Sequence, residues 1–412
     1  MLTDAKKIIS DSIAAVLPDE AVHRALTGRT FSGQVVLVAI GKAGWRMAQA
    51  AHSALGSAIS RGVVITKYGH SEGAIGNLEI IEAGHPVPDE NAVRGARRAL
   101  KLVAGLSAED TVLFFISGGG SALFELPADG VSLDDIADLT RQLLACGADI
   151  TEINAIRKHL SRVKGGRFAQ ACAPANVLSV ILSDVLGDPI DAIASGPAAA
   201  DHSTCEDVRR IIDKYSLSVP AHILPVLAAE TPKRLDRVET VITGNVTALC
   251  AAAARSAQAL GYQPLVLTTT LDCEAREAGS MLAAIAREIR RSSSPVASPC
   301  AIIMGGETVV HLRGSGKGGR NQELALSAAS GIAGLENVCL FSLGSDGTDG
   351  PTDAAGGIVT GSFAAACRQK GLSIDDALQN NDAYPLLKEM HALIETGPTG
   401  TNVNDVAVLL CR

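Results

Sequence analysis

The sequence predicts an α/β protein of two domains, in which helices cover buried parallel strands. Short apolar runs recur along the chain, and several lead into a glycine-rich turn and then a helical pattern. Hydrophobic residues make up 47% of the 412 residues but aromatic residues only 3%, so Ala, Val, Leu and Ile must fill the core. A proline-rich break at residues 220–237 separates two expected domains, 1–235 and 236–412.

The overall composition excludes several classes of protein. A net charge of −8 argues against a nucleic-acid partner. The nine cysteines contain no CxxC pair, which indicates a reducing, cytoplasmic location without a disulfide framework or zinc knuckle. Residues 1–17 are predicted to form an amphipathic helix and not a signal peptide. No apolar run approaches the roughly 20 residues that a membrane span needs.

The first predicted strand, Gln34–Ile40, runs into Gly41-Lys42-Ala43-Gly44 and a helix from Trp45. Ligands bind to α/β folds at such strand ends, and Lys42 above a helix N-terminus suits a phosphate, although a solvated loop lysine is the alternative. A dinucleotide loop would read G-x-G-x-x-G, with an acid after the next strand. Here that strand, Gly62–Thr66, ends in Lys67, which argues against a nicotinamide cofactor.

The strand Thr111–Ile116 leads into Ser117-Gly118-Gly119-Gly120-Ser121 and a helical Ala-Leu pair. Three glycines at such a turn expose several N–H groups to one point, and the serines add hydroxyl donors. We expect an anion cradle, distinct from a Walker loop because the closing Gly-Lys-Ser/Thr is missing. Upstream, Ile80–Asp89 is an extended, proline-bounded loop in which His85 is a ligand contact or a structural histidine.

A basic cluster and two carboxylates follow within residues 133–188. Leu133–Leu144 is predicted to be helical, and Asn154 is a candidate cap for a helix carrying Arg157, Lys158 and Arg162. This basic cluster would attract a polyanion such as a nucleotide, unless it is a solvated face. Asp184 and Asp188 follow the strand Asn176–Leu182 and suit Mg²⁺ or a hydroxyl group, or one of them caps a helix.

The second half repeats this pattern around an Ala-rich helix ending at Leu260. Its predicted strands are Val238–Ile242, Gln263–Leu267, Cys300–Met304, Asn337–Ser342 and Val406–Leu410. Between the last three lie Gly305-Gly306-Glu307, a glycine-rich loop ending at Arg320-Asn321, and a helix expected from Glu323. Arg320 and Asn321 can bind carboxylate or phosphate oxygens together. A later glycine loop with Asp346, Asp349 and Asp353 suggests a hard cation or a hydroxyl group.

Phosphoryl transfer needs cationic groups, N–H cradles and carboxylates for a metal ion and an attacking hydroxyl, and the chain supplies each type. A G-x-S-x-G elbow and an H-E-x-x-H motif are both absent. The chain also carries an ordered set of motifs: IGKAG at 40–44, ISGGGSAL at 116–123, SDVLGDP at 183–189, ASGP at 194–197, GGET at 305–308, GGRNQE at 318–323 and GSDGTDG at 344–350. Over nearly the whole chain, this set resembles the class II glycerate 2-kinases.

The resemblance implies a Rossmann-like N-terminal domain, a C-terminal MOFRL α/β domain and an active site in the cleft between them. It also implies ATP- and Mg²⁺-dependent phosphorylation of D-glycerate at its 2-hydroxyl, giving 2-phosphoglycerate. A homodimer is one assembly compatible with the sequence. Two alternatives remain open: an NAD(P)H-dependent hydroxypyruvate reductase, and a catalytically silent protein that binds a sugar acid.

The residue patterns and the family resemblance together give a set of candidate site residues. Lys42, Arg320 and Asp184 are the expected catalytic residues, and Asp184, Asp346 and Asp349 the expected metal ligands. The expected substrate and nucleotide contacts are Gly41, Ser117, Gly118, Gly119, Gly120, Ser121, Asn154, Arg157, Lys158, Asp188, Glu307, Asn321 and Asp346.

Overall fold

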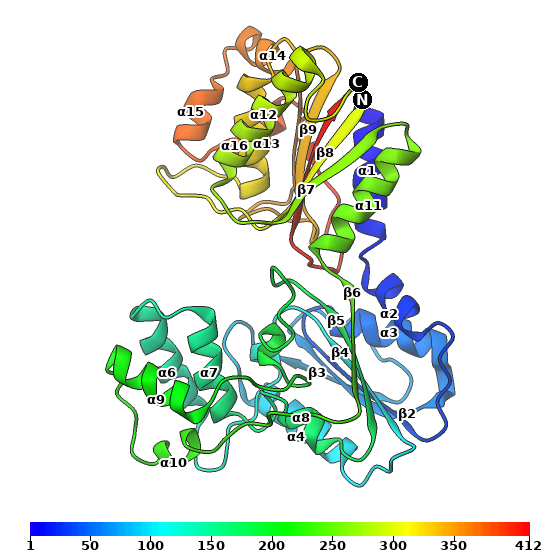
Figure 1. Ribbon diagram of the computed structural model, residues 1–412, viewed down its shortest axis with the longest axis vertical. Coiled ribbons are helices and arrows are strands. Elements are labelled where there is room, and N and C mark those ends of the chain that lie inside the picture. Colours follow the sequence, from blue (N-terminus) through cyan, green and yellow to red (C-terminus); the bar gives the residue numbers. More distant parts are fainter. The chain divides into compact units, whose positions relative to one another are not determined.

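The computed structural model describes residues 1–412 and forms two compact units. The N-terminal unit comprises Ala21–Thr243. The C-terminal unit comprises Gly244–Arg412 together with Met1–Glu20 (Figure 1). The two-domain α/β prediction is confirmed, and each unit is built on its own six-stranded sheet.

The sheet of the N-terminal unit has the order β3-β2-β1-β4-β5-β6, and neighbours from β3 to β5 pair in parallel. Its strands are β1 Val35–Ile40, β2 Ile59–Lys67, β3 Leu78–Ala83, β4 Thr111–Ile116, β5 Asn176–Leu182 and β6 Val238–Gly244. Every residue of β1 and β4 is buried. Burial on both faces explains why these strands appear in the sequence as unbroken apolar runs.

Helices cover both faces of this sheet. Along β1, Val36 and Val38 belong to one core cluster and Leu37 and Ala39 to another, because successive side chains point to opposite faces. A third cluster joins helices beside the sheet. The helices are α2 Pro18–Leu26, α3 Gly44–Leu55, α4 Glu90–Val103, α5 Gly120–Leu123, α6 Leu133–Ala145, α7 Ile150–Leu160, α8 Arg167–Ala171, α9 Cys205–Tyr215 and α10 Leu224–Leu227, with short 3-10 turns at Gly56–Ala58 and Ile193–Ser195.

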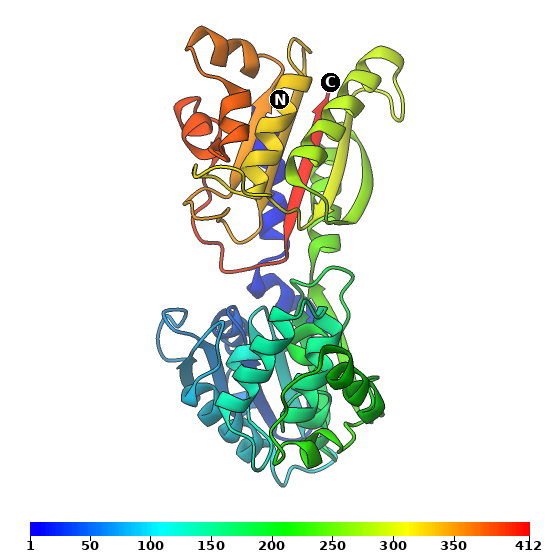
Figure 2. The same cartoon turned by 90° about the vertical axis from the view of Figure 1, so that its left-hand side faces the viewer.

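The sheet of the C-terminal unit has the order β11-β10-β9-β12-β8-β7. Its strands are β7 Gln263–Leu271, β8 Cys300–Gly306, β9 Val338–Gly344, β10 Gly356–Thr360, β11 Leu393–Ile394 and β12 Asp405–Cys411. Strand β12, red in Figure 2, lies between β8 and β9 and is antiparallel to both. Only β7 and β8 pair in parallel, so the expectation of parallel strands is wrong for this unit.

The helices of the C-terminal unit include one from the start of the chain. They are α1 Leu2–Ala14, α11 Val246–Ala259, α12 Ala275–Ser292, α13 Arg320–Gly331, α14 Phe363–Gln369, α15 Ile374–Gln379 and α16 Ala383–Glu389. Helix α13 begins at Arg320, three residues before the predicted start at Glu323. None of the helices is long and apolar enough to cross a membrane.

The compact units divide the chain differently from the predicted domains 1–235 and 236–412. Helix α1 packs against α11, and Asp11 accepts a hydrogen bond of 2.7 Å from Ser256. The buried apolar face of α1 therefore completes the core of the C-terminal unit. The proline-rich segment 220–237 lies within the N-terminal unit, where Thr231 donates a 2.8 Å hydrogen bond to Asp201.

Candidate active site

Two glycine turns at the carboxyl end of the parallel sheet are joined by hydrogen bonds. The Lys42 N–H donates to the Gly118 carbonyl at 2.9 Å, and the Ala43 N–H donates to Ser117 Oγ at 3.1 Å. Gly41 has φ +105°, and a Cβ there would lie 2.3 Å from Ser117 Oγ. Only glycine fits this close approach. The two turns that the sequence predicted separately, after β1 and after β4, are thus one structure.

Three polar side chains surround the triglycine turn. A Cβ on Gly118 would lie 2.3 Å from Asp184 Oδ2, and one on Gly119 would lie 2.9 Å from His85 Cδ2 and 3.4 Å from Lys42 Cγ. Lys42, His85 and Asp184 are therefore brought together at this edge of the N-terminal unit. Helix α3 begins at Gly44 without a side-chain cap, so its N-terminal N–H groups add positive potential near Lys42.

The protonation of His85 reflects these surroundings. Burial, followed by the cations Lys42 and Lys67, lowers the pKa of His85 below its usual range. The imidazole is therefore neutral at physiological pH and able to act as a hydrogen-bond partner or proton acceptor. His70, which sequence reasoning missed, lies with its Nδ1 3.2 Å from the Lys42 carbonyl oxygen. A histidine after a strand that ends in Lys67 was the only signal for it.

A chain of hydroxyl and amide groups extends from the same turn. Ser121 Oγ lies 3.0 Å from Ser195 Oγ, and Ser195 Oγ donates to Asn154 Oδ1 at 3.1 Å. Ala194, Ser195 and Gly196 have φ values of 52°, 60° and 64°. Each left-handed non-glycine residue costs on the order of 1–3 kcal/mol, and such strain is concentrated at functional sites. Ser195 is fully buried, so this segment is held firmly beside Ser121.

The expected role of Asn154 as a helix cap is wrong. Asp149 caps α7, accepting from the Glu152 N–H at 2.9 Å, and Glu152 in turn accepts from the Asp149 N–H. This is a capping box, and Asp149 with Glu152 three residues later was a signal for it in the sequence. Asn154 lies one turn into the helix, where its side chain meets Ser195.

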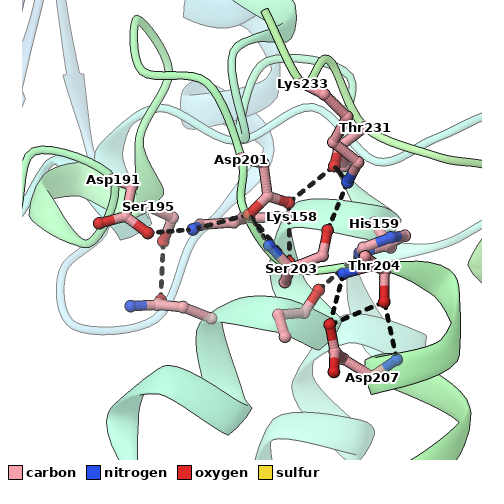
Figure 3. A network of polar contacts seen from close by, with 12 residues as sticks. Lys158, His159, Asp191, Ser195, Asp201, Ser203, Thr204, Asp207, Thr231 and Lys233 are labelled. Atoms are coloured by element: carbon pink, nitrogen blue, oxygen red, sulfur yellow. Dashed lines mark hydrogen bonds and ion pairs between the residues drawn. The ribbon is translucent and has the colours of Figure 1, made fainter.

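The expected basic cluster does not form a shared cationic surface. Lys158 is buried and its Nζ lies 3.1 Å from both Asp191 and Asp201 (Figure 3). Arg157 instead donates from Nε to Thr140, and Arg162 pairs with exposed Asp129. Each cation thus has its own partner within the unit. The prediction of a joint polyanion-binding face from residues 157–162 is corrected accordingly.

A second polar cluster lies in the C-terminal unit at the start of α13. Arg320 Nε and Nη2 donate to the two oxygens of Asp405 at 2.6 and 3.1 Å, and Nη1 donates to Glu307 at 2.9 Å. Burial disfavours the charge of Arg320, but the hydrogen bonds and charge of Asp405 outweigh it and raise the pKa of the guanidinium. Three of its five N–H donors are thus used, which leaves two for a ligand.

Asp349 supports the same helix end. Its Oδ1 accepts from the Asn321 N–H at 3.1 Å and its Oδ2 from the Gln322 N–H at 2.9 Å. Burial raises the pKa of Asp349 to about 7, against these hydrogen bonds. Asn321 is buried and accepts from Ser342 at 2.6 Å. Both residues therefore serve α13, and the geometry does not favour Asp349 as a metal ligand because both of its oxygens are engaged.

Asp346 has one oxygen in local contacts. Its Oδ1 accepts from the Thr348 N–H at 2.9 Å and from the Thr348 hydroxyl at 3.1 Å. It begins the turn between β9 and β10, in the unit that also holds Arg320. Asp346 therefore retains an oxygen that these bonds do not use.

Comparison with known proteins places these features in context. The model for a domain of unknown function, DUF4147, matches residues 4–228, and the MOFRL family model matches residues 300–405. The D-glycerate 2-kinase of Thermotoga maritima is 54% identical over 98% of this chain and 97% of its own. A crystal structure of glycerate kinase from Thermotoga maritima matches with a TM-score of 0.97 and 53% identity over 100% of this chain and 99% of that chain. An Agrobacterium vitis relative, 40% identical over 98% of this chain and 93% of its own, has the name putative hydroxypyruvate reductase.

Proposed function

Because the chain belongs to the class II glycerate 2-kinase family, we propose that it phosphorylates the 2-hydroxyl of D-glycerate with ATP, giving 2-phosphoglycerate and ADP. The observation that carries this proposal is the joined pair of turns at Lys42 and Gly118. It holds a flexible cation, a glycine-rich backbone, a neutral imidazole and a carboxylate around one point. Those groups are what the transfer of a phosphoryl group requires.

Lys42 is proposed to neutralise the charge of the transferring phosphoryl group. Its side chain is half-buried above the uncapped start of α3, where an anion gains from both the ammonium and the helix end. Gly118, Gly119 and Gly120, between Ser117 and Ser121, let phosphate or carboxylate oxygens approach the backbone. In the reaction the 2-oxygen of glycerate forms a bond to phosphorus, the bond to ADP breaks, and the hydroxyl proton leaves.

Asp184 is our candidate to accept or orient that proton. Its carboxylate lies directly against the Gly118 backbone, as the 2.3 Å approach to a Cβ there indicates. His85 is a second acceptor on the same turn, since its pKa is lowered by burial and by Lys42. Asp188 follows on the same loop and has φ +53°, a local conformation that favours a functional role.

Arg320 is proposed to bind the glycerate carboxylate or the transferring phosphoryl group with its two remaining donors. Glu307 and Asp405 hold the guanidinium plane, so little side-chain entropy is lost on binding. The family resemblance implies that Lys42 and Arg320 serve one reaction. This remains a prediction, and substituting each residue in turn tests it.

Mg²⁺ is proposed to accompany ATP, and the carboxylates present fit a hard cation. In the N-terminal unit, Asp184 beside the glycine turn is the residue that would hold it. In the C-terminal unit, the candidate is Asp346, which has an oxygen outside its local bonds. When bound, such an ion neutralises phosphate charge and orients the phosphates. Asp349 is a weaker candidate, because the α13 N–H groups take both of its oxygens.

The nucleotide is proposed to use a cavity of about 710 Å³ in the N-terminal unit. Asn154 and Lys158 line it together with apolar Val185 and Leu186. Arg210 and Lys214 also line it, each paired with a lining carboxylate, Asp207 and Glu152. Clefts of roughly 300–1,000 Å³ with apolar walls and a few polar groups are typical of small-molecule sites. At this cavity the Lys158 ammonium is already paired with Asp191, whereas Arg157 donates a hydrogen bond to Thr140.

A pair of assays tests the proposed function against its alternatives. Purified protein with ATP and Mg²⁺ should release ADP only when D-glycerate is added. Oxidation of NADH that depends on hydroxypyruvate would instead support the reductase, and glycerate binding without ADP release would support a silent binding protein. The turn after β1 reads Gly-Lys-Ala-Gly and lacks the dinucleotide pattern, so we expect no NADH oxidation. Cytoplasmic location and dimer formation remain predictions.

A further inference from the structure

A His–Cys–Glu cluster lies in the N-terminal unit, formed by residues that the proposed kinase chemistry does not use. It comprises His159 near the end of α7, Cys205 at the start of α9 and Glu230 in the loop after α10. One ligand atom from each residue, a ring nitrogen, the sulfur and a carboxylate oxygen, lies within 4.8 Å of the other two. We call these three residues the HCE cluster.

One ring nitrogen of His159, Nε2, has a lone pair without a hydrogen-bond partner. The side chain is fully buried, and its Nδ1 lies 2.8 Å from the Ala155 carbonyl oxygen. A carbonyl oxygen only accepts, so Nδ1 carries the hydrogen, and Nε2 of the neutral ring presents a lone pair. Nε2 is buried without any hydrogen-bond partner. A buried polar atom without a partner destabilises the fold, and a ligand at Nε2 would remove that penalty.

The hydrogen bond from Nδ1 to a backbone carbonyl is also typical of histidines that bind a metal ion. Metal-ligating histidines nearly always donate their other ring N–H to a carbonyl or carboxylate, which fixes the tautomer and the ring plane. The hydrogen bond from Nδ1 to the Ala155 carbonyl therefore leaves the Nε2 lone pair available for a metal ion.

The other two residues of the cluster are held in place. The Cys205 N–H donates to Glu230 Oε1 at 3.0 Å, and Lys233 pairs with Glu230 Oε2 at 2.8 Å. Lys233 also donates to the Ser203 carbonyl and to Thr231, which fixes the loop, as Figure 3 shows. Together with a thiolate, the Glu230 carboxylate supplies two negative charges, which equal the charge of a divalent ion.

From this geometry we propose that His159, Cys205 and Glu230 bind one Zn²⁺-type cation through Nε2, Sγ and a carboxylate oxygen. Imidazole, thiolate and carboxylate are the ligand set that zinc prefers, whereas Mg²⁺ prefers oxygen atoms alone. Tetrahedral binding with ligands at about 2.0–2.3 Å needs the three atoms roughly 3.5 Å apart, so the cluster contracts on binding. Glu230 is exposed, so water can take the fourth position.

Such a site would pin α7, α9 and the loop after α10 to one another. The sulfur binds as a thiolate, so Cys205 gives up a proton when the ion binds. The role is structural and separate from the Mg²⁺ proposed at Asp184, because it uses different residues and a softer ligand set.

The test uses the full chain freed of metal, titrated with Co²⁺ and with Zn²⁺. We expect one equivalent of Co²⁺ to produce a thiolate-to-cobalt charge-transfer band, and one equivalent of Zn²⁺ to remove it. Cys205→Ser should abolish the band and weaken Zn²⁺ binding by more than the roughly 10–100-fold that loss of an outer-sphere partner costs. Glu230→Gln should keep the band but weaken binding.

Cys146→Ser provides the matched control, since Cys146 is an exposed free thiol in the same unit, outside the HCE cluster. It should leave the band and the affinity unchanged. Absence of a band at one equivalent, an undiminished band in Cys205→Ser, loss of the band in Cys146→Ser, or unchanged affinity in Glu230→Gln would each overturn the assignment. Cys205 is only half-buried and Glu230 is exposed, so these variants should fold.

Discussion

Arg320 donates hydrogen bonds to both carboxylate oxygens of Asp405, with Nε 2.6 Å from Oδ2 and Nη2 3.1 Å from Oδ1. Asp405 is the first residue of β12, the last strand of the chain, and Arg320 the first of α13. This two-pronged contact fixes the plane of the guanidinium and the direction of its remaining N–H groups. A residue proposed to act on a phosphoryl or carboxylate group is thus oriented before substrate binds.

Replacing Arg320 by Ala should lower turnover by on the order of a hundredfold or more, because a fixed charge stabiliser is lost. Arg320→Lys should not restore it, since an ammonium cannot bridge both Asp405 oxygens. Steady-state kinetics of ADP release measures the effect. Arg313→Ala is the control, because Arg313 lies on the same segment, is exposed and pairs at 3.6 Å with Glu274. Near-normal turnover in Arg320→Ala would remove this residue from the mechanism.

Replacing Lys42 by Met should abolish most turnover and raise the pKa of His85. Burial and then the Lys42 cation lower that pKa in the parent protein, so removing the cation favours protonation of the ring. An NMR titration of the His85 ring checks the shift independently of activity. An unchanged His85 pKa would show that Lys42 does not lie close to the triglycine turn in solution.

Gly119→Ala should impair turnover much more than Gly105→Ala. Both glycines have positive φ, 83° and 75°, so both substitutions carry similar backbone strain. A Cβ at Gly119 meets His85 at 2.9 Å, whereas a Cβ at Gly105 has no atom within 4 Å. Kinetics and thermal unfolding of the two variants separate these effects. Equal losses of activity would mean that the triglycine turn has no special role.

Lys158→Met should destabilise the fold by about 3–5 kcal/mol, because it leaves buried Asp201 without its cation. Arg162→Met, which removes an exposed pair with Asp129, should cost less than about 1 kcal/mol. Urea unfolding of both variants measures the difference. Similar stabilities would contradict the reassignment of Lys158 from a surface cluster to a buried network.

The prediction for residues 157–162 failed because partners distant in sequence cannot be identified from local spacing. The helical pattern correctly indicated a helix carrying these cations, but Asp191 and Asp201 reach Lys158 only through the fold. Likewise, the run Val406–Leu410 indicated a strand, but not that β12 inserts antiparallel between β8 and β9. Strand direction and sheet order depend on non-local pairing.

For other elements, the local sequence pattern was sufficient to predict the structure. The strands Thr111–Ile116 and Asn176–Leu182 match their predicted bounds, because burial on both faces leaves an unbroken apolar run ended by polar or glycine residues. Parallel strands deliver their following loops to the same edge, which explains why Lys42 and Gly118 meet, although the sequence predicted the turns after β1 and β4 separately. His70 was missed because its only signal, a position shortly after a strand that ends in Lys67, does not distinguish it from an ordinary loop histidine.

The most direct test of the proposed function is phosphorus NMR of the product formed from D-glycerate, ATP and Mg²⁺. We predict a single new phosphomonoester resonance that matches 2-phosphoglycerate, appearing together with ADP and missing when D-glycerate is omitted. A resonance that matches 3-phosphoglycerate, or no new phosphomonoester while ATP stays intact, would contradict the assignment of this chain as a glycerate 2-kinase.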